Sequence, residues 1–445
     1  MRIQHLTPFA FIILVLIGCS KSNTGNNPVN PASLPTLTLT VAAHTITSSS
    51  ATISATILTD GGSPIVARGV CWSVSQNPTT ANFRTTAGTG LGEFTSSLVG
   101  LNTNTTYYAR IYATNSSGTT YDNQFSITTN NTDVYVAGFL FNGTREVATV
   151  WKNGSPALLT NGLYDTKANS VFVVGNDVYV AGNDKMPGTG ITIAKVWKNG
   201  IPTALTDGTR TAEARSVFVS GNDVYVAGIE HNSFVFTAKV WKNGIGTTLP
   251  TGGFTSEASS VFVSGTDVYV AGWELVGGTI SARIWKNGVI FPIPNNPIFT
   301  RPTSVVVSGA DVYFSGGSYS GSPSNAKFWK NGVESLLNNP SNSSVAEQLY
   351  IQGSDVYVAG SEMNGVKPMA KVWKNSTSLP LNLALNSTFA NSVFVSGSDV
   401  YSCGYEYVDT AQFGSRYDAR LWKNGAVTHL TNGTQYTKAL SVFVK

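Results

Sequence analysis

Cysteine, histidine and charged residues are scarce in this sequence of 445 residues. It has three cysteines and four histidines, and charged residues make up only 12%, about half the usual share. Three cysteines are too few for a disulfide framework. The net charge of +4 comes without a basic block, which excludes an electrostatic nucleic-acid-binding surface. No H-E-x-x-H, G-x-S-x-G or phosphate-loop motif occurs, so we expect no metal and no other cofactor.

Long hydrophobic runs are also absent, apart from LTPFAFIILVLI at residues 6–17. This run is too short to span a bilayer as a helix and has the length of a signal-peptide core. The tetrapeptide Leu16-Ile17-Gly18-Cys19 resembles the lipobox of bacterial lipoproteins. The alternative is an ordinary cleaved signal peptide in which the cysteine stands by chance.

The lipobox resemblance implies a signal peptide at residues 1–18 and acylation of Cys19. It also implies a lipid-anchored protein of the cell envelope, at the outer membrane and facing the periplasm or the surface, which touches the membrane only through its anchor. Residues 19–35 show no periodicity and are expected to form a flexible tether.

Short strands with alternating apolar and polar residues are predicted between residues 36 and 129. Runs such as ATISATIL and YYARIYA are separated by Gly, Ser, Asn and Pro clusters, which indicates a β-sandwich. The segment LNTNTTYYARIYATN at 101–115 resembles the end of a fibronectin type III module, and Leu101 and Tyr107 match its tyrosine-corner pattern. Such modules are usually spacers or adhesive units. The lone thiol of Cys71 is expected to be buried.

Residues 131–445 consist of repeats. The motif DVYVAG or a near copy begins at Asp133 and recurs six times, after 44 or 46 residues each time. SVFVSG or a near copy precedes it in every repeat but the first. Each repeat therefore predicts four strands, for example SVFVSG, DVYVAG, AKVWKNG and IPTAL, and a period of this length indicates a repeat architecture.

The turn residues predict how the four strands connect. Gly221-Asn222 suits a type II′ turn between the first two strands, and Asn199-Gly200 suits a type I′ turn between the last two. Tight hairpins make neighbouring strands antiparallel, which excludes a β-solenoid. Apolar residues on both faces of the first two strands require each sheet to be covered on both sides. These features predict sheets that stack around a ring.

The expected fold class is therefore all-β, with a fibronectin type III-like sandwich at residues 36–129 followed by a seven-bladed β-propeller at residues 131–445. The first repeat lacks its SVFV strand, and a spare copy at Ser441–Val444 ends the chain. We expect one blade to be closed by N- and C-terminal strands, because this leaves no open sheet edge.

The repeated WKNG sequence has two interpretations. Tryptophan, lysine and asparagine side by side are typical of sugar or phosphate contacts, which would make seven binding sites. In an antiparallel sheet, however, Asp177 would face Lys198 across the strand pair, and Trp197 would pack against the neighbouring sheet. Asn199-Gly200 would then form the turn. We favour this structural interpretation for all seven copies.

The connections from second to third strand and from fourth to first share one face, which we call the loop face, and they vary in length and sequence. Variable loops on a rigid scaffold are where binding specificity usually resides. Five repeats have an acidic residue two positions after the second-strand glycine: Asp184, Glu230, Glu274, Glu362 and Glu406. Aromatic residues accompany them, notably Trp273, Tyr405 and Tyr407. The carboxylates either accept backbone hydrogen bonds in their own loops or, with these aromatic residues, line a ligand-binding mouth.

We expect a monomeric binding protein that presents its loop face to a glycan or to an extracellular or periplasmic protein. The alternative is a propeller-type hydrolase or lyase of polysaccharides, which would need an asymmetric pair of carboxylates. Glu146, Asp165, Glu334 and Asp409 depart from the repeat, but no pattern links any two of them. No catalytic residue is therefore assigned, and no motif surrounds His231 or His429.

Overall fold

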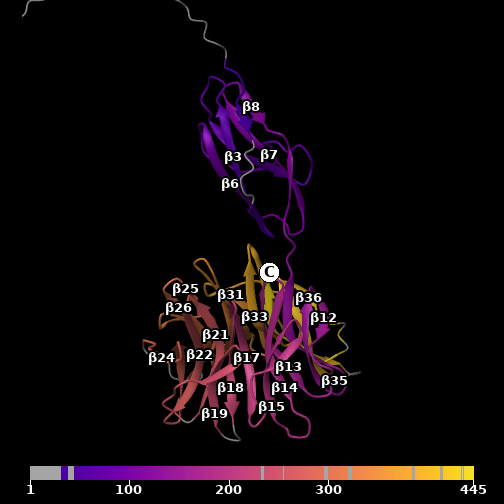
Figure 1. The fold of residues 1–445 in the computed structure, drawn as a ribbon, viewed down its shortest axis with the longest axis vertical. Helices are drawn as coiled ribbons and strands as arrows, with labels where there is room; N and C mark the ends of the chain where they lie inside the picture. Colours follow the sequence, from indigo (N-terminus) through magenta and orange to yellow (C-terminus); the bar gives the residue numbers. More distant parts are fainter. Residues whose placement is uncertain are drawn as a thin grey trace, which may run out of the picture. The chain divides into compact units, whose positions relative to one another are not determined.

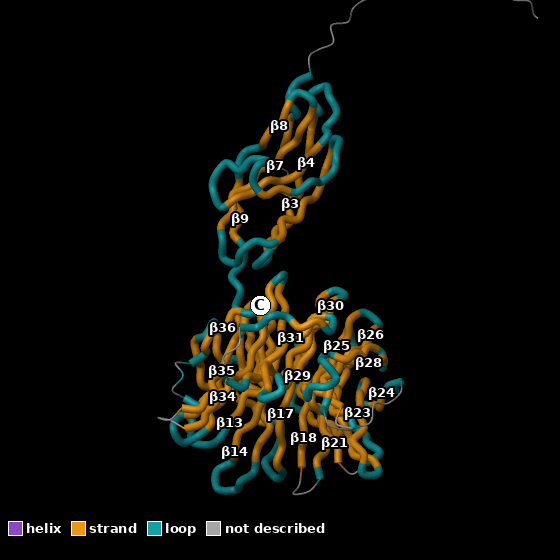
Figure 2. The backbone as a smooth tube through the Cα atoms, turned by 180° about the vertical axis from the view of Figure 1, so that it is seen from behind, coloured by secondary structure: helices purple, strands orange, loops and turns teal. Residues whose placement is uncertain are grey.

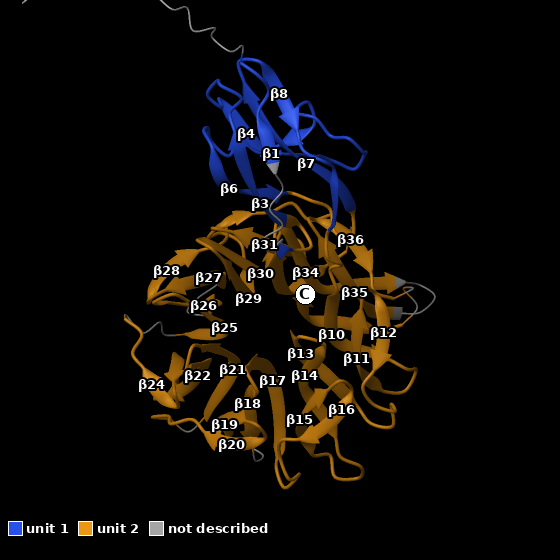
Figure 3. Cartoon of the chain, turned by 45° about the horizontal axis from the view of Figure 1, so that its top comes forward, with its two compact units in different colours: residues 1–46, 51–99, 106–128 blue, residues 47–50, 100–105, 129–445 orange. Residues whose placement is uncertain are grey.

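The computed structural model describes residues 32–38, 45–231, 235–253, 255–294, 299–318, 323–382, 386–410, 414–431, 433 and 435–445. Cys19, the signal peptide and residues 19–31 of the tether lie outside the described residues. The described chain divides into two compact units (Figure 3), one with residues up to 46, 51–99 and 106–128 and the other with residues 47–50, 100–105 and 129–445. Strands and loops build both units (Figure 2). Within these ranges no helix has the length and apolar character needed to cross a membrane.

The first unit is a sandwich of two sheets. One sheet contains β1 (Thr36–Thr38), β2 (Thr45–Ile46), β3 (Ser50–Thr59) and β6 (Gly92–Val99). The other contains β4 (Ala67–Ser73), β5 (Phe83–Arg84), β7 (Thr106–Asn115), β8 (Gly118–Tyr121) and β9 (Phe125–Thr128). Ile57, Phe94 and Ile111 pack together between the sheets. The Cys71 thiol is buried as predicted, and this burial raises its pKa to about 11.

The second unit is a β-propeller of seven four-stranded sheets, whose strands Figure 1 shows from the side. The sheets lie in a ring around a central axis (Figure 3). The innermost strands are β13 (Thr166–Val174), β17 (Thr211–Ser220), β21 (Thr255–Ser264), β25 (Thr300–Ser308), β29 (Ser344–Gln352), β33 (Thr388–Ser396) and β37 (Thr437–Val444). The second strands are β10 (Val134–Phe141), β14 (Asp177–Lys185), β18 (Asp223–His231), β22 (Asp267–Val276), β26 (Asp311–Ser318), β30 (Asp355–Met363) and β34 (Asp399–Thr410).

The two outer positions of each sheet follow the same order. The third strands are β11 (Glu146–Lys152), β15 (Thr192–Lys198), β19 (Phe236–Lys242), β23 (Thr279–Lys286), β27 (Asn325–Lys330), β31 (Pro368–Lys374) and β35 (Gly414–Lys423). The outermost strands are β12 (Ser155–Leu158), β16 (Ile201–Ala204), β20 (Ile245–Thr248), β24 (Val289–Phe291), β28 (Val333–Leu336), β32 (Thr377–Ser378) and β36 (Ala426–His429). All strand pairs within these sheets are antiparallel, as the hairpin turns predict.

One sheet joins the two ends of the repeat region. Its innermost strand is β37, which pairs with β10, the pairing that the incomplete first and last repeats predict. The main chains of Lys445 and Asp133 exchange two hydrogen bonds of 3.0 Å beside this pair. Val442 and Val444 of β37 also pack in one cluster with Tyr401 of the preceding sheet. Through these contacts the last sheet in the chain packs on the first.

The hydrophobic core lies between neighbouring sheets. The seven tryptophans of the WKNG copies are the largest fully buried side chains. Trp197, for example, packs in one cluster with Tyr135 and Val150 of the preceding sheet. The structural interpretation of the tryptophans is thereby confirmed, since none of them is accessible to a ligand.

The rest of the WKNG sequence stabilises the hairpin end. Lys198 Nζ lies 2.8 Å from an Asp177 carboxylate oxygen, and the predicted pair recurs in all seven sheets. Asn199 donates to the other Asp177 oxygen at 2.8 Å and accepts from the Val178 N–H at 2.8 Å. The φ angles of +51° at Asn199 and +81° at Gly200 fit the type I′ turn. Water screens exposed pairs of this kind, so each contributes little to the free energy of unfolding.

A β-bulge interrupts each innermost strand. In β13 the register with β14 shifts between Ala168 and Ser170, so that Asn169 has no partner in the register. The other six innermost strands shift at the equivalent place. The bulge explains the glycine of DVYVAG, because a Cβ atom at Gly182 would collide with the Lys167 carbonyl oxygen.

The serine beside each bulge links neighbouring sheets. Ser170 Oγ accepts a hydrogen bond of 3.2 Å from the Val217 N–H of the next innermost strand. Equivalent bonds link four more pairs of innermost strands. In β29 a glutamine replaces the serine, and Gln348 Oε1 accepts the corresponding bond from Val393 at 3.2 Å. The first serine of SVFVSG therefore has a structural role around the ring.

Candidate functional site

The five loop-face carboxylates do not form a free acidic mouth, because each is paired with a cation of the adjacent third strand. Asp184 pairs with Lys195, Glu230 with Lys239, Glu274 with Arg283, Glu362 with Lys371 and Glu406 with Arg420. Glu274 and Glu406 are only 1% and 3% exposed, so the prediction that they contact a surface ligand is wrong. The alternative prediction of backbone hydrogen bonds holds in part, since Glu274 also accepts from the Gly252 N–H at 2.9 Å.

The cation partner could have been found from the sequence. It occupies the first lysine of AKVWKNG, for example Lys195. The repeat with Leu140 in place of the acid has Thr149 in place of that lysine. Where Ser318 replaces the acid, Lys327 instead pairs with Glu334 at 3.0 Å. Acid and base are thus lost together in one repeat, and in the other the remaining lysine pairs with a different carboxylate, which indicates an ion pair.

Trp273 does not offer an exposed stacking surface, contrary to the prediction. Its side chain is only 7% exposed, and it lies opposite Glu257 in the register of β21 and β22. The Arg301 guanidinium lies 4.6 Å from the centroid of its ring. Trp273 is therefore part of the propeller packing, because the Arg301 cation covers its ring and the side chain is almost fully buried.

Tyr405 and Tyr407, by contrast, belong to a group of aromatic side chains on the loop face that we call the aromatic cluster. Its members come from β10, β33, β34, β35 and the segment before β37: Phe139, Phe141, Phe389, Tyr405, Tyr407, Tyr417 and Tyr436. Neighbouring ring centroids lie 4.8–6.4 Å apart, which is the range of favourable aromatic pairs. All except Phe139 keep part of their surface exposed.

A lysine lies at the centre of the aromatic cluster. Lys438 Nζ is 4.4 Å from the ring centroid of Tyr405 and 3.9 Å from that of Tyr417, a cation–π arrangement. Burial and then the nearby Lys167 lower the pKa of Lys438, while Glu146 partly offsets this. Burial raises the pKa of Tyr405 to about 12, with smaller contributions from neighbouring tyrosines and Glu347. The cluster thus combines half-exposed rings with one amino group that has no carboxylate partner among the described residues.

The carboxylates that depart from the repeat are also engaged. Glu146 lies 3.1 Å from Lys167, and Asp165 lies 3.4 Å from Arg145. Asp165 also accepts from the Glu146 backbone N–H at 3.2 Å. Cys403 is fully buried, and this burial raises its pKa far above the ordinary value. Within the described ranges, no group of three His, Cys, Asp or Glu residues could hold a metal ion.

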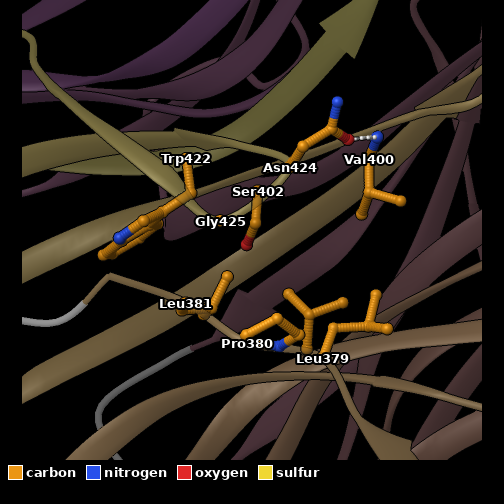
Figure 4. A pocket seen from close by; sticks show the side chains of 9 residues that line it. Leu379, Pro380, Leu381, Val400, Ser402, Trp422, Asn424 and Gly425 are labelled. Carbon is orange, nitrogen blue, oxygen red and sulfur yellow. Dashed lines mark hydrogen bonds between the residues drawn. The ribbon is translucent and has the colours of Figure 1, made fainter.

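Apolar pockets recur between neighbouring sheets near the hairpin ends. One has a volume of about 200 Å³ and is lined by Leu379, Pro380, Leu381, Val400 and Trp422 (Figure 4). Equivalent pockets contain Phe291, Pro292 and Phe314 in one case and Leu205 and Val226 in another. Their recurrence follows from the repeat geometry, and they offer few polar groups that could orient a ligand.

No family model matches the sequence, and no similar sequence is found among curated proteins. Among solved structures, the propeller domain of the Trilobed protease from Pyrococcus furiosus is similar over 90% of this chain and 97% of its own, with 10% identity and a TM-score of 0.38. TolB from Acinetobacter baumannii is similar over 75% of this chain and 76% of its own, with 10% identity and a TM-score of 0.35. Both likenesses are distant.

Proposed function

We propose that this protein is a monomeric, lipid-anchored binding protein of the cell envelope. In this proposal Cys19 carries the lipid, a fibronectin type III-like module spaces the anchor from the rest, and a seven-bladed propeller presents its loop face to a glycan or protein ligand. The aromatic cluster supports the proposal most directly. In this proposal the protein binds its ligand and catalyses no reaction.

The aromatic cluster is confined to one part of the ring. The position of Tyr405 is taken by Asn183, Ile229, Gly317 and Ser361 in four other sheets. Structural packing common to all sheets would recur in all of them, as the buried tryptophans do. A feature built once in a sevenfold repeat therefore fits a single binding site.

A glycan is the ligand class that the cluster favours. Half-exposed tyrosine and phenylalanine rings stack on the apolar faces of sugar rings, and tyrosine hydroxyls and the Lys438 amino group can donate hydrogen bonds to sugar oxygens. The rings are held by one another, so little conformational entropy is lost on binding. Such a preformed surface is compatible with micromolar affinity.

A glycan array probed with the chain lacking residues 1–19 tests this function. For the best glycan, Tyr417→Ala is expected to weaken binding at least tenfold, roughly 1.4 kcal/mol, with the melting temperature nearly unchanged. Phe236→Ala is the matched control, because Phe236 pairs with His231 in β18 and β19 as Tyr417 pairs with Tyr407 in β34 and β35. Equal losses in both variants would contradict a site at the aromatic cluster.

The anchor is tested separately in the full-length protein. Cys19→Ala should move the protein from the detergent-extracted membrane fraction to the soluble fraction or leave it unprocessed. Membrane association of a processed variant would contradict lipidation. Because Cys19 lies far along the chain from the aromatic cluster, glycan binding should survive this substitution.

A further inference from the structure

A polar cavity occupies the centre of the propeller. Its volume is about 200 Å³, and residues of all seven innermost strands line it. The bulge of each strand supplies one lining residue. Five strands place Asn169, Ser259, Thr303, Asn391 and Leu440 there, and the other two place Arg215 and Glu347. The residue at the bulge position thus differs from sheet to sheet, whereas the residues that follow it are repeated.

A series of aromatic rings connects the innermost strands on the side of the turns between first and second strands. Phe172, Phe218 and Phe262 follow one another with centroids 4.7–4.8 Å apart, and Phe443 lies 4.9 Å from Phe172. Tyr350 and Phe394 continue the series at 4.7 Å. The polar cavity lies three positions earlier on these strands, on the side of the loop face.

Most polar groups around the cavity already have protein partners. Asn169 Nδ2 donates to the Ala214 carbonyl at 2.8 Å, and Asn391 Nδ2 donates to the Ala439 carbonyl at 2.7 Å. Thr303 Oγ1 donates to the Ala346 carbonyl at 3.0 Å. These bonds engage amide and hydroxyl hydrogens, so the amide oxygens of the two asparagines are left as acceptors.

Arg215, the only cation among the lining residues, is also neutralised. It lies 3.3 Å from Glu213 of its own strand and is paired with Glu257 of the next innermost strand. With two carboxylates on one guanidinium, this part of the channel carries no spare positive charge for an anionic ligand.

Glu347 is the exception among the lining residues. Its carboxylate has no hydrogen-bond or ion-pair partner in the part of the chain that the structure describes. Its side chain is partly buried and lines the cavity. The β29 register with β30 is broken there over two residues, between Ala346 and Leu349. Burial raises the pKa of Glu347 to about 7. A desolvated carboxylate without a partner is costly, and a positive donor beside it would remove that cost.

We infer that the central channel is a binding site for a small primary ammonium compound, whose N–H groups bond to the Glu347 carboxylate and to neighbouring amide oxygens. The cavity volume admits a compound of a few heavy atoms, such as an amino alcohol. The absence of a three-residue metal-binding group from the described chain and the acceptor-rich lining favour an organic cation over a metal ion. This site is separate from the aromatic cluster and does not depend on the proposed function.

Binding should require the ionised form of Glu347. The other titratable or charged groups near it are Arg215, which is already paired, Tyr350 of its own strand and Tyr405 of β34, whose pKa is raised in part by Glu347. Neither tyrosine ionises near neutral pH. At about pH 5.5, a carboxyl with a pKa of about 7 is ionised in roughly one molecule in thirty.

The test is calorimetric titration of the chain lacking residues 1–19 with ethanolamine, and with ethylene glycol as the neutral control. Ethanolamine should bind at least tenfold more tightly at about pH 8 than at about pH 5.5, and at least tenfold more tightly than ethylene glycol. Glu347→Gln should weaken ethanolamine binding at least tenfold and abolish its pH dependence. Glu334→Gln, a matched change at an exposed carboxylate, should leave both unchanged.

Any one of three results would overturn the proposal. Ethanolamine could fail to bind at about pH 8, ethylene glycol could bind as tightly as ethanolamine, or Glu347→Gln could bind ethanolamine with unchanged affinity. Glu347→Gln should fold at least as stably as the parent, because it removes a desolvated acid. A lower melting temperature of this variant in the absence of ligand would show instead that Glu347 serves the packing, and would also overturn the proposal.

Discussion

Replacing Trp197 and Trp285 by phenylalanine, one at a time, measures what holds neighbouring sheets together. Both side chains are 0% exposed and occupy the same position of the repeat. They differ in one contact. Trp285 Nε1 donates a hydrogen bond of 2.8 Å to the Pro250 carbonyl, whereas Trp197 Nε1 is buried and has no hydrogen-bond partner among the described residues. The two variants therefore remove similar volumes but different hydrogen-bonding groups.

The expected magnitudes follow from this difference. Each substitution leaves a cavity of a few tens of Å³, which costs about 1 kcal/mol. Trp285→Phe also leaves the Pro250 carbonyl without its partner, at about 1–3 kcal/mol. Trp197→Phe instead removes an unsatisfied N–H, which offsets the cavity cost. We expect a loss of about 2–4 kcal/mol for Trp285→Phe and about 0–1 kcal/mol for Trp197→Phe.

Urea unfolding followed by circular dichroism is the appropriate assay, because the remaining tryptophans complicate fluorescence. Trp197→Ala and Trp285→Ala serve as references and should each cost about 3–5 kcal/mol, the range for buried aromatic side chains. Equal losses in the two phenylalanine variants would refute the reasoning, because cavity size alone would then determine stability.

Three further predictions concern the propeller. Removing residues 440–445 takes most of β37 from its sheet and should cost about 3–6 kcal/mol through the lost burial of Val442 and Val444 alone, besides the exposed edge of β10. Thermal melting measures this loss, and an equal cut at residues 22–27 should leave the melting temperature unchanged. Gly182→Ala should cost about 1–3 kcal/mol through the collision with the Lys167 carbonyl, and a melting temperature equal to the parent's would contradict the bulge geometry. The hydrogen bond from Lys198 lowers the pKa of Asp177. This pair should therefore stabilise the fold above the ordinary aspartate pKa of about 4, and the stabilisation should be lost as the pH falls through the lowered value. Between about pH 6 and pH 2, the melting temperature of Asp177→Asn should fall less than that of the parent protein.

Much of the propeller could be predicted because its repeat carries local turn chemistry. Asn199-Gly200 fixes a two-residue hairpin, and this hairpin places Asp177 beside Lys198. The bulge at Asn169 could not be predicted in the same way, since it lies just before the segment equivalent to SVFVSG and the residue at this position differs from repeat to repeat. Only the glycine of DVYVAG, such as Gly182, indicates a close backbone approach, and glycine in a strand has several causes.

The candidate site was predicted less well, because the sequence shows spacing but not partners. Glu274 and Glu406 recur at one offset, which suggested a shared ligand, whereas they share a structural partner on the third strand. Tyr405 and Tyr407 could be named from their loop. Tyr436 could not be grouped with them, because it precedes β37 and meets Phe139 and Phe141 of β10 only when the two ends of the repeat region come together.

The sevenfold repeat itself separates structure from function in this protein. A contact that stabilises every sheet, such as the Asp177–Lys198 pair, is needed seven times, so its residues repeat. A site for one ligand is needed once, so it must depart from the repeat. The largest departures at partly accessible positions are the aromatic cluster and the bulge residue Glu347. Both lie toward the loop face, and Glu347 is close enough to Tyr405 to influence its pKa. Function should therefore be sought around β29, β33 and β34, where the repeat is broken on neighbouring strands.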